Sequence, residues 1–343
     1  MHPLVISKVE RDTPNAVLIS FVIPEELKEK FVFEAGQYLT LETNIGERKV
    51  RRSYSICSAP SDGLQVGIKE VPGGVFSTHA NRIVKAGETI MVAPPQGRFT
   101  FLKSGGEQRL VFFAAGSGIT PIISIIKTAL NENKDTIVYL VYGNRTPEDT
   151  LFYEELKNME KLFLLRLKIK WIFSRTNIKE SLFGRIEANV VNNTLDQLQD
   201  YDTDKFYLCG PEPMINIVSK TLNEKGISSS KILFELFNTS PKGTKEVSPS
   251  TSSTLEIIYD DINYKIVSQE GKSILDTALD NKLDVPYSCQ GGVCSSCIAR
   301  LKSGKAEMQA NQILTDDEVK EGLILTCQAH PTSKQVLVDY DDV

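Results

Sequence analysis

Four cysteines near the C-terminus have the spacing of an iron–sulfur ligand set. Cys289, Cys294 and Cys297 form the pattern C-x4-C-x2-C, and Cys327 follows after 29 further residues. In the plant-type [2Fe–2S] spacing, a tight loop supplies three thiolates and a distant strand supplies the fourth. The sequence therefore predicts that these four cysteines hold a [2Fe–2S] cluster.

Two other uses of the cysteines are less consistent with the sequence. A structural zinc site usually pairs two short C-x2-C knuckles, and only one is present here. Disulfides need an oxidising compartment, and residues 1–5 do not resemble a signal peptide. No uncharged apolar run is long enough for a membrane span, so we expect a cytoplasmic protein without membrane contact.

The scarcity of histidine excludes several kinds of redox and hydrolytic site. His2, His79 and His330 are the only three histidines, and none forms a motif with another. Rieske centres, 2-His-1-carboxylate iron sites and metalloprotease motifs each need a histidine pair. We therefore expect any oxygen chemistry to be carried out by a separate oxygenase or hydroxylase protein.

Charge is distributed unevenly along the chain. Residues 255–343 carry 15 acidic and 8 basic side chains, a net charge of -7, whereas the whole chain carries -5, which leaves +2 for the first 254 residues. The total argues against nucleic-acid binding. The acidic C-terminal part either steers docking to a basic partner or is simply a solvated acidic surface.

The residues upstream of the cysteines must fold into elements that can deliver electrons. Residues 1–103 read as short strands separated by glycine and proline turns, which favours an antiparallel barrel. Arg52 and Tyr54 lie two residues apart on one of these strands and so share a face. The guanidinium could hold a diphosphate while the ring stacks on a planar cofactor; the alternative is ordinary surface and packing roles.

A second candidate phosphate site follows at Gly73 and Gly74. These glycines lead into Ser77 and a predicted helix over 76–83, whose N–H groups could bind a phosphate. A plain glycine turn before a capped helix is the alternative interpretation.

From residue 108 strands alternate with helices. Predicted strands over 110–115, 137–142, 165–173 and 206–209 alternate with predicted helices to 130, over 149–159 and over 211–225. This pattern indicates a doubly wound α/β domain that binds ligands at the carboxyl ends of its strands. Gly116, Gly118 and Thr120 follow one strand and Gly210 follows another, which together favour a dinucleotide crevice.

The last part of the chain is predicted to be a separate small domain. Residues 238–254 are almost free of hydrophobic side chains and read as an interdomain linker, unless they form an ordered surface loop. Beyond them, strands, a helix over 274–281, the cysteine loop and further strands fit a small α+β domain.

Taken together, these motifs resemble the ferredoxin–NADP reductase superfamily with a plant-type ferredoxin fused at the C-terminus. Within it, the order of domains and the motifs RSYSICS, GITP, CGP and SCQGGVCSSC are most similar to the reductase components of phenylacetyl-CoA epoxidase and of 3-ketosteroid 9α-hydroxylases. The resemblance implies an FAD-binding β-barrel (1–103), an NAD(P)-binding α/β domain (104–237), a linker (238–254) and a β-grasp ferredoxin domain (255–343).

The resemblance also implies roles for individual residues. Arg52 would bind the FAD diphosphate, Tyr54 would stack on the isoalloxazine, and Ser55 would lie near flavin N5. Cys209 would lie by the nicotinamide, so that Tyr54, Ser55 and Cys209 form the expected catalytic set. The remaining cofactor-binding candidates are Ser53, Gly74, Val75, Ser77, Gly116, Gly118, Thr120, Arg145, Ser174, Arg175 and Gly210.

NADPH is the expected donor, with NADH as an alternative. Ser174 and Arg175 end a predicted strand where an NAD-selective site often carries a carboxylate, and an arginine there accommodates a 2′-phosphate. Arg145 and Arg185 are further candidates for the same phosphate.

The expected function is electron transfer from NAD(P)H through FAD and the [2Fe–2S] cluster to an oxygenase. A flavin is needed because a nicotinamide gives up two electrons as hydride whereas the cluster accepts one. Reduction of free ferredoxin, flavodoxin or quinone is the alternative enzymatic function, and a non-catalytic scaffold with a zinc loop is the third hypothesis.

Overall fold

The structure is a computed structural model that describes residues 1–102, 106–198, 203–237 and 253–343. The chain divides into two compact units, Met1–Glu235 and Leu236–Val343. Most of the predicted linker, residues 238–252, lies outside the described residues. Among the helices of the described ranges, none is both long enough and apolar enough to cross a membrane.

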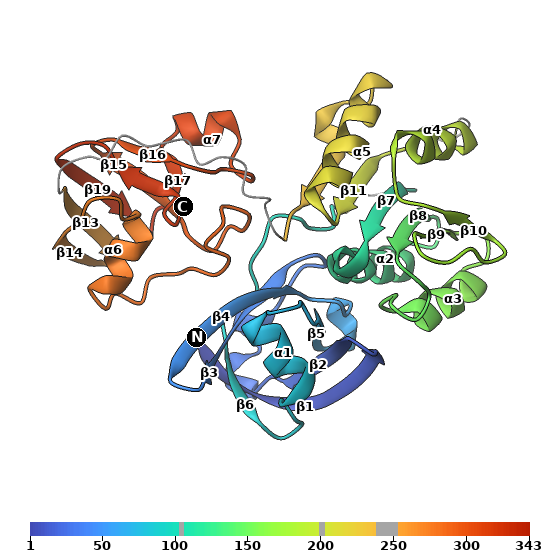
Figure 1. Cartoon of the computed structure of the whole chain (residues 1–343), viewed down its shortest axis with the longest axis horizontal. Helices are drawn as coiled ribbons and strands as arrows, with labels where there is room; N and C mark the ends of the chain where they lie inside the picture. The colour runs from blue at the N-terminus through green and yellow to red at the C-terminus, as the bar shows by residue number, and fades with distance from the viewer. Residues whose placement is uncertain (103–105, 199–202, 238–252) are drawn as a thin grey trace. The chain divides into compact units, whose positions relative to one another are not determined.

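The first half of unit 1 is an antiparallel barrel, as predicted. Six strands pair in the order β4-β3-β6-β1-β2-β5, and the ends of this sheet meet where Ile56 bridges Val66. Figure 1 shows these strands curling around one another, with α1 (Val75–Arg82) lying across them. The strands are β1 (His2–Thr13), β2 (Ala16–Val22), β3 (Tyr38–Ile45), β4 (Arg48–Ser55), β5 (Leu64–Lys69) and β6 (Thr89–Val92).

Apolar side chains at alternate positions of the strands form the core of the barrel. On β3, Leu39 and Leu41 are fully buried and contribute to one apolar cluster with residues of β1, β2 and β5. Because neighbouring side chains on a strand point to opposite faces, Thr40 between them faces the other side of the sheet. Short 3-10 turns occur at η1 (Glu25–Leu27), η2 (Glu29–Phe31) and η3 (Pro60–Asp62).

The second half of unit 1 is a parallel sheet with helices on both faces. The strand order is β10-β9-β8-β7-β11-β12, with α2 and α3 on one face and α4 and α5 on the other (Figure 1). The strands are β7 (Arg109–Ala115), β8 (Ile137–Asn144), β9 (Leu167–Phe173), β10 (Ser181–Phe183), β11 (Lys205–Cys209) and β12 (Ile232–Glu235). The helices are α2 (Ile119–Glu132), α3 (Tyr153–Leu162), α4 (Ala188–Gln197) and α5 (Glu212–Glu224), with 3-10 turns η4 (Gly116–Gly118) and η5 (Ser229–Lys231).

The strand order reverses at β7, which lies between β8 and β11. In open α/β sheets this reversal separates the loops that follow the two neighbouring strands and creates a crevice at their carboxyl ends. The loops after β7 and β11 are those that the sequence singled out.

The helix predicted from residue 149 begins later, because Phe152 adopts a left-handed backbone conformation (φ 59°) directly before α3. A residue with that conformation cannot belong to a right-handed helix. Three further elements, α4, β10 and β12, were not predicted; β10 and β12 are only three and four residues long, too short to give a periodic signal.

Unit 2 is the small α+β domain that was predicted. A mixed five-stranded sheet has the order β14-β13-β19-β15-β17, and β16 pairs with β18 in a separate ribbon. Capping boxes at Ser273 and Thr315 start its two helices. The elements are β13 (Thr254–Tyr259), β14 (Ile262–Val267), α6 (Ile274–Asp280), β15 (Ile298–Ser303), β16 (Ala306–Met308), α7 (Asp316–Lys320), β17 (Leu323–Leu325), β18 (Ala329–Pro331) and β19 (Gln335–Asp339).

Candidate functional site

The candidate flavin strand is β4, which pairs with β3 along its whole length. Arg52 lies opposite Leu41 and Tyr54 lies opposite Leu39, so the two side chains share a face. The Arg52 side chain is exposed, and its Nη1 donates a hydrogen bond to the Arg51 carbonyl at 2.6 Å. A guanidinium and a phenol ring are thus presented together.

The Tyr54 ring packs against α1. Its centroid lies 5.5 Å from that of Phe76, at an interplanar angle of 41°. Burial raises the pKa of Tyr54 above its ordinary value, so the phenol stays protonated at neutral pH. Ser53 points to the other face of the strand, where its Oγ lies 3.2 Å from the Thr40 hydroxyl.

The start of α1 forms a candidate anion-binding turn. A Cβ at Gly74 would lie 2.5 Å from Ser77 Oγ and 3.0 Å from the Val71 carbonyl, so only glycine fits there. The Ser77 hydroxyl accepts a hydrogen bond from Val71 N at 3.1 Å and thereby shapes the turn. No side chain caps the helix, which leaves the N–H groups of its first turn, Val75 included, for an anion. Together with Arg52, this donor set fits the diphosphate of FAD.

The candidate nucleotide crevice lies where β7 and β11 end. Gly116 after β7 has a left-handed backbone (φ 57°), and a Cβ at Gly118 would lie 2.2 Å from the Cys209 carbonyl. The two loops therefore touch through a position that only glycine can occupy. The Thr120 hydroxyl donates to the Ser117 carbonyl at 3.0 Å, and α2 begins without a side-chain cap. Gly210 completes the opposite side of the crevice. This arrangement fits the diphosphate of a dinucleotide.

The ends of β8 and β9 bring two arginines together. Ser174 N donates to the Asn144 carbonyl and Arg175 N donates to the Arg145 carbonyl, each at 3.0 Å. Arg145 and Arg175 are therefore on adjacent backbone segments, and both residues are exposed. Arg185, which follows β10, is exposed as well.

Glu235 neighbours Cys209 and bonds to Ser55 where the barrel borders the nucleotide sheet. Glu235 is the register partner of Cys209 on the neighbouring strand, and Ser55 Oγ donates to Glu235 Oε2 at 3.4 Å. Burial raises the pKa of Glu235 to about 8, which the hydrogen bond from Ser55 partly opposes. Burial also raises the pKa of the Cys209 thiol, and the nearby Glu235 carboxylate raises it further, so the thiol stays protonated.

Glu235 is a candidate functional residue that the sequence reasoning missed. The strand that carries it has only four residues, and Ser55 is 180 positions away in the chain. The available signal was an acidic residue ending the apolar run Ile232–Phe234. Such a residue is more often a solvated strand end, and only the fold brings it to Ser55.

The four predicted cluster ligands lie together in unit 2 as two pairs. The thiol of Cys294 contacts that of Cys289, and the thiol of Cys297 contacts that of Cys327. The Cys294 thiol, followed by backbone N–H groups such as that of Gly291 (3.4 Å), lowers the pKa of Cys289 to about 6. Two pairs of sulfurs fit two irons, each held by one pair, whereas zinc needs four ligands around one point. Within the described ranges no three His, Cys, Asp or Glu side chains converge on a single-ion site.

Backbone contacts close the cysteine loop. Gly292 has a left-handed backbone (φ 73°), and a Cβ there would lie 2.9 Å from the Ala310 carbonyl. The side-chain amide of Gln328, next to Cys327, donates to the Gln290 carbonyl at 2.9 Å. The loop that carries three cysteines is thereby tied to the segment that carries the fourth.

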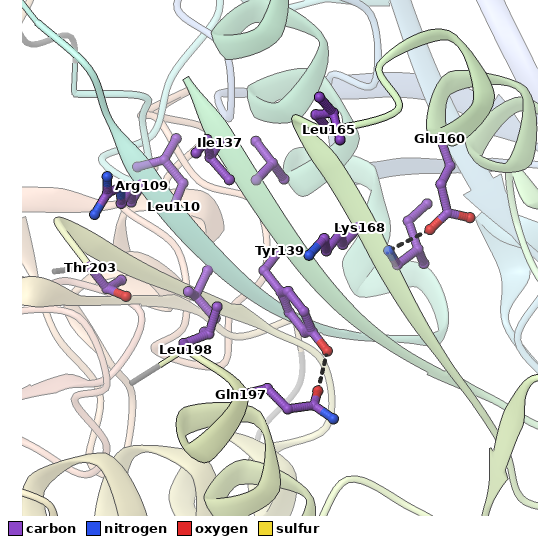
Figure 2. A pocket seen from close by; sticks show the side chains of 13 residues that line it. Arg109, Leu110, Ile137, Tyr139, Glu160, Leu165, Lys168, Gln197, Leu198 and Thr203 are labelled. Carbon is purple, nitrogen blue, oxygen red and sulfur yellow. Dashed lines mark hydrogen bonds between the residues drawn. The ribbon is translucent and has the colours of Figure 1, made fainter. Parts of the chain in front are cut away.

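A cavity of 480 Å³ lies at the other end of the nucleotide sheet, where β7, β8 and β9 begin. Figure 2 shows Arg109 and Ile137 at these strand starts and the 2.9 Å hydrogen bond from the Tyr139 hydroxyl to Gln197 at its edge. Its position, opposite the Gly116 and Gly210 loops, separates it from the nucleotide crevice.

Comparisons with known proteins agree with this division of the chain. Three family models match: an oxidoreductase FAD-binding domain (residues 3–101), an oxidoreductase NAD-binding domain (112–220) and a 2Fe-2S iron-sulfur cluster binding domain (257–332). One of the subunits of 1,2-phenylacetyl-CoA epoxidase from Escherichia coli K12 is 35% identical over 99% of this chain and 98% of its own length. The ferredoxin reductase component of 3-ketosteroid-9-alpha-monooxygenase from Rhodococcus rhodochrous is 31% identical, over 98% and 96% of the two chains.

Among solved structures, phthalate dioxygenase reductase has a similar fold. It matches 98% of this chain and 97% of its own with a TM-score of 0.62 at 23% identity. This similarity supports the barrel, the parallel nucleotide sheet and the ferredoxin domain.

Proposed function

The chain belongs to the family of oxygenase reductase components with FAD-, NAD- and [2Fe–2S]-binding domains, and from this membership we propose that it serves a phenylacetyl-CoA epoxidase-like oxygenase. The chain is an NAD(P)H-dependent oxidoreductase. It passes electrons from NAD(P)H through FAD to the [2Fe–2S] cluster and on to a separate oxygenase component.

The residues of unit 1 bind and orient the two reacting groups. When bound, FAD supplies the conversion of a two-electron hydride into single electrons. Arg52 and the start of α1 would hold its diphosphate, and Tyr54 would pack against its ring. Gly116, Gly118 and Thr120 hold the diphosphate of the nicotinamide nucleotide.

The link from Ser55 through Glu235 to Cys209 is the observation that carries these assignments. It joins the end of the candidate flavin strand to the ends of β11 and β12, which supports neighbouring sites for the flavin and the nicotinamide. The protonated Glu235 carboxyl, which accepts the hydrogen bond from Ser55, places a polar hydrogen at this border, where it can bond the flavin ring. The Cys209 thiol is small and uncharged, so the nicotinamide can pack against it.

NADPH is the proposed donor. Arg145 and Arg175 lie on adjacent strand ends, both exposed, where a ribose 2′-phosphate can receive two guanidinium groups. An NAD-selective site commonly has a carboxylate at that strand end, and this chain has Ser174 and Arg175 there.

The proposed partner is tested by reconstitution. The purified reductase, loaded with FAD and cluster, is mixed with the oxygenase components of a phenylacetyl-CoA epoxidase, NADPH and phenylacetyl-CoA. We expect NADPH consumption to be coupled to epoxide formation, with no product from a 3-ketosteroid mixed with the corresponding steroid oxygenase. Coupling to the steroid oxygenase alone would contradict the proposed partner while leaving the electron route intact.

A general reductase of ferredoxin, flavodoxin or quinone is the competing function. It would reduce these acceptors at least as fast as the oxygenase and would show no co-purification with oxygenase components. A cytoplasmic location is proposed as well, because a reducing compartment preserves the thiols that serve as cluster ligands.

A further inference from the structure

Asp12 is the extra residue of a β-bulge in β1. Arg11 pairs with Val17 and Thr13 pairs with Ala16, which leaves Asp12 without a partner on β2. β-Bulges redirect side chains and are frequent next to active sites. Here the carboxylate leaves the barrel sheet, and its Oδ2 accepts a hydrogen bond from Phe152 N at 3.0 Å, 140 residues further along the chain.

Phe152 is held in an unusual conformation. Its left-handed backbone (φ 59°) is unfavourable for a bulky residue, and its N–H precedes α3, where no helical partner exists. Asp12 supplies the acceptor that this N–H needs. Backbone strain of this kind persists only where surrounding contacts maintain it, and it is concentrated at functional sites.

The Phe152 side chain connects this contact to the nucleotide loop. It is 1% exposed, and a Cβ at Gly67 on β5 would lie 3.6 Å from its ring and 2.9 Å from Thr120 Cγ2. The ring is therefore packed close to both the barrel strand and Thr120 of the candidate diphosphate loop. A shift of Phe152 would be transmitted to Thr120 within one layer of packed side chains.

Charged groups surround the contact. Lys127 on α2 forms an ion pair with Glu155 at 2.6 Å and lies 5.8 Å from the centroid of the Phe152 ring. Burial raises the pKa of Asp12, the N–H of Phe152 opposes this, and Glu155 and Glu10 add to it. The residue as a whole is exposed, so the hydrogen bond from Phe152 N, and not the partial burial of the carboxylate, indicates a specific role.

Other hydrogen bonds cross the same boundary of unit 1, and two of them involve α2 or the segment before α3. Ser124 Oγ donates to the Ser58 carbonyl at 2.6 Å, and Lys69 Nζ donates to the Asp149 carbonyl at 2.9 Å. The first bond anchors α2 to the barrel and the second anchors the segment before α3. Neither of them holds a residue with a strained backbone. Asp12 is thus the contact whose loss releases stored strain.

We propose that Asp12 is a positioning residue for hydride transfer: by fixing Phe152 it holds the nucleotide-binding half against the flavin barrel, so that the nicotinamide meets the flavin in a reactive geometry. This inference rests on the proposed roles of Thr120 and of the flavin strand. Asp12 acts through Phe152 and touches neither cofactor.

The test uses full-length protein loaded with FAD and cluster. Asp12→Ala is compared with Asp12→Asn, which keeps an acceptor oxygen of the same reach. We expect the limiting rate of flavin reduction at saturating NADPH to fall about tenfold in the alanine variant, because small misplacements of reacting groups cost rate steeply. We expect Asp12→Asn to stay within about threefold of wild type. The long-wavelength charge-transfer absorbance between nicotinamide and flavin should weaken in parallel with the rate.

Glu10→Ala is the matched control. Glu10 lies two residues away on β1 and forms a surface ion pair with Lys8 at 2.7 Å, so its loss should leave both readouts unchanged. If Asp12→Ala does not retain FAD, Asp12→Ser is the second test variant. The serine hydroxyl is too short to accept the hydrogen bond from Phe152 N.

Three outcomes would overturn the proposal. The first is an unchanged limiting rate in both Asp12→Ala and Asp12→Ser. The second is a loss of thermal stability with no change in rate or charge-transfer absorbance, and the third is an equal loss in Asp12→Asn and Asp12→Ala. A wild-type flavin that NADPH and NADH both fail to reduce would instead overturn the proposed function.

Discussion

Glu235 is a half-buried acid whose pKa is shifted by its surroundings. Burial raises its pKa from 4.5 to about 8, so the folded protein holds a proton that the unfolded chain releases between these values. Stability from this proton is fully present below pH 4.5, declines above it and is lost as the pH rises through about 8. Ser55 and Cys209 are the polar groups that face it.

Glu235→Gln should remove this pH dependence, because the amide imitates the protonated carboxyl and does not titrate. Thermal unfolding of both proteins is followed by flavin fluorescence between about pH 5 and pH 9. We expect similar midpoints at the acid end and a variant more stable by about 2 kcal/mol, or about 4–8 °C, at the alkaline end. Parallel curves for the two proteins would contradict the raised pKa.

Gln328 is a residue whose side chain closes the cluster loop. Its amide donates to the Gln290 carbonyl at 2.9 Å and to the Cys327 carbonyl at 3.2 Å, and it lies 3.8 Å from Cys327 Sγ. Hydrogen bonds around the ligand sulfurs tune the cluster potential and limit solvent access.

Gln328→Met keeps the length of this side chain but removes the donor. We expect faster iron release to a chelator, by about threefold or more for the loss of one hydrogen bond, and a more negative cluster potential. Potentiometry with electron paramagnetic resonance detection measures the second quantity. Gln335→Met, on the exposed face of β19, is the control; an effect as large in the control would rule out a specific role for Gln328.

Residue-level prediction from the sequence succeeds where chemistry is local. The cysteine pattern places three ligands within nine residues, so their spacing alone predicts a cluster loop. Asp12 and Glu235 gain their environments from partners 140 and 180 positions away. The residues next to them in the sequence do not indicate those partners, so neither role could be predicted before the fold was known.

At the level of elements, the strand ends of β8 and β9 support the cofactor preference. Arg145 and Arg175 are joined by a backbone hydrogen bond of 3.0 Å, so a phosphate that contacts one is within reach of the other. Arg185 is exposed after β10 but lies beyond these two strand ends in the sheet order.

Arg175→Ala should therefore raise the Michaelis constant for NADPH far more than that for NADH. Loss of a charge-assisted hydrogen bond to phosphate corresponds to about a tenfold change or more. Steady-state rates with both donors measure it, and Arg185→Ala is the matched control. Equal effects of Arg175→Ala on the two donors would remove the argument for a 2′-phosphate site.

Element prediction succeeded for long apolar segments and failed for two short edge strands and for the helix α4. The run Leu110–Ala114 is apolar throughout, as a strand buried on both faces must be, and it forms the centre of the parallel sheet. β10 and β12 are edge strands of three and four residues whose existence depends on pairing with β9 and β11. The late start of α3 depends on Asp12, which fixes the left-handed Phe152.

At the scale of the whole molecule, the chain runs from the flavin domain through the nucleotide domain to the cluster domain. Electrons run from the nucleotide to the flavin and then to the cluster. Barrel and nucleotide sheet belong to one compact unit because Ser55, Asp12 and Lys69 bond across their boundary. The cluster lies in a second unit, with its own core and its own capped helices. Electrons must therefore pass from one unit to the other and then to a protein partner.

The acidic character of the cluster unit predicts how that last transfer depends on salt. Residues 255–343 carry a net charge of -7, so electrostatic attraction should accelerate encounter with a basic acceptor and be screened by salt. We expect the second-order rate constant for reduction of the basic protein cytochrome c to fall about tenfold between about 0.02 and 0.5 M NaCl, concentrations that give a long and a short Debye length. An uncharged quinone acceptor is the control, because no electrostatic attraction draws it to the acidic surface. A cytochrome c rate as insensitive to salt as the quinone rate would mean that the acidic surface is only solvated and does not guide docking.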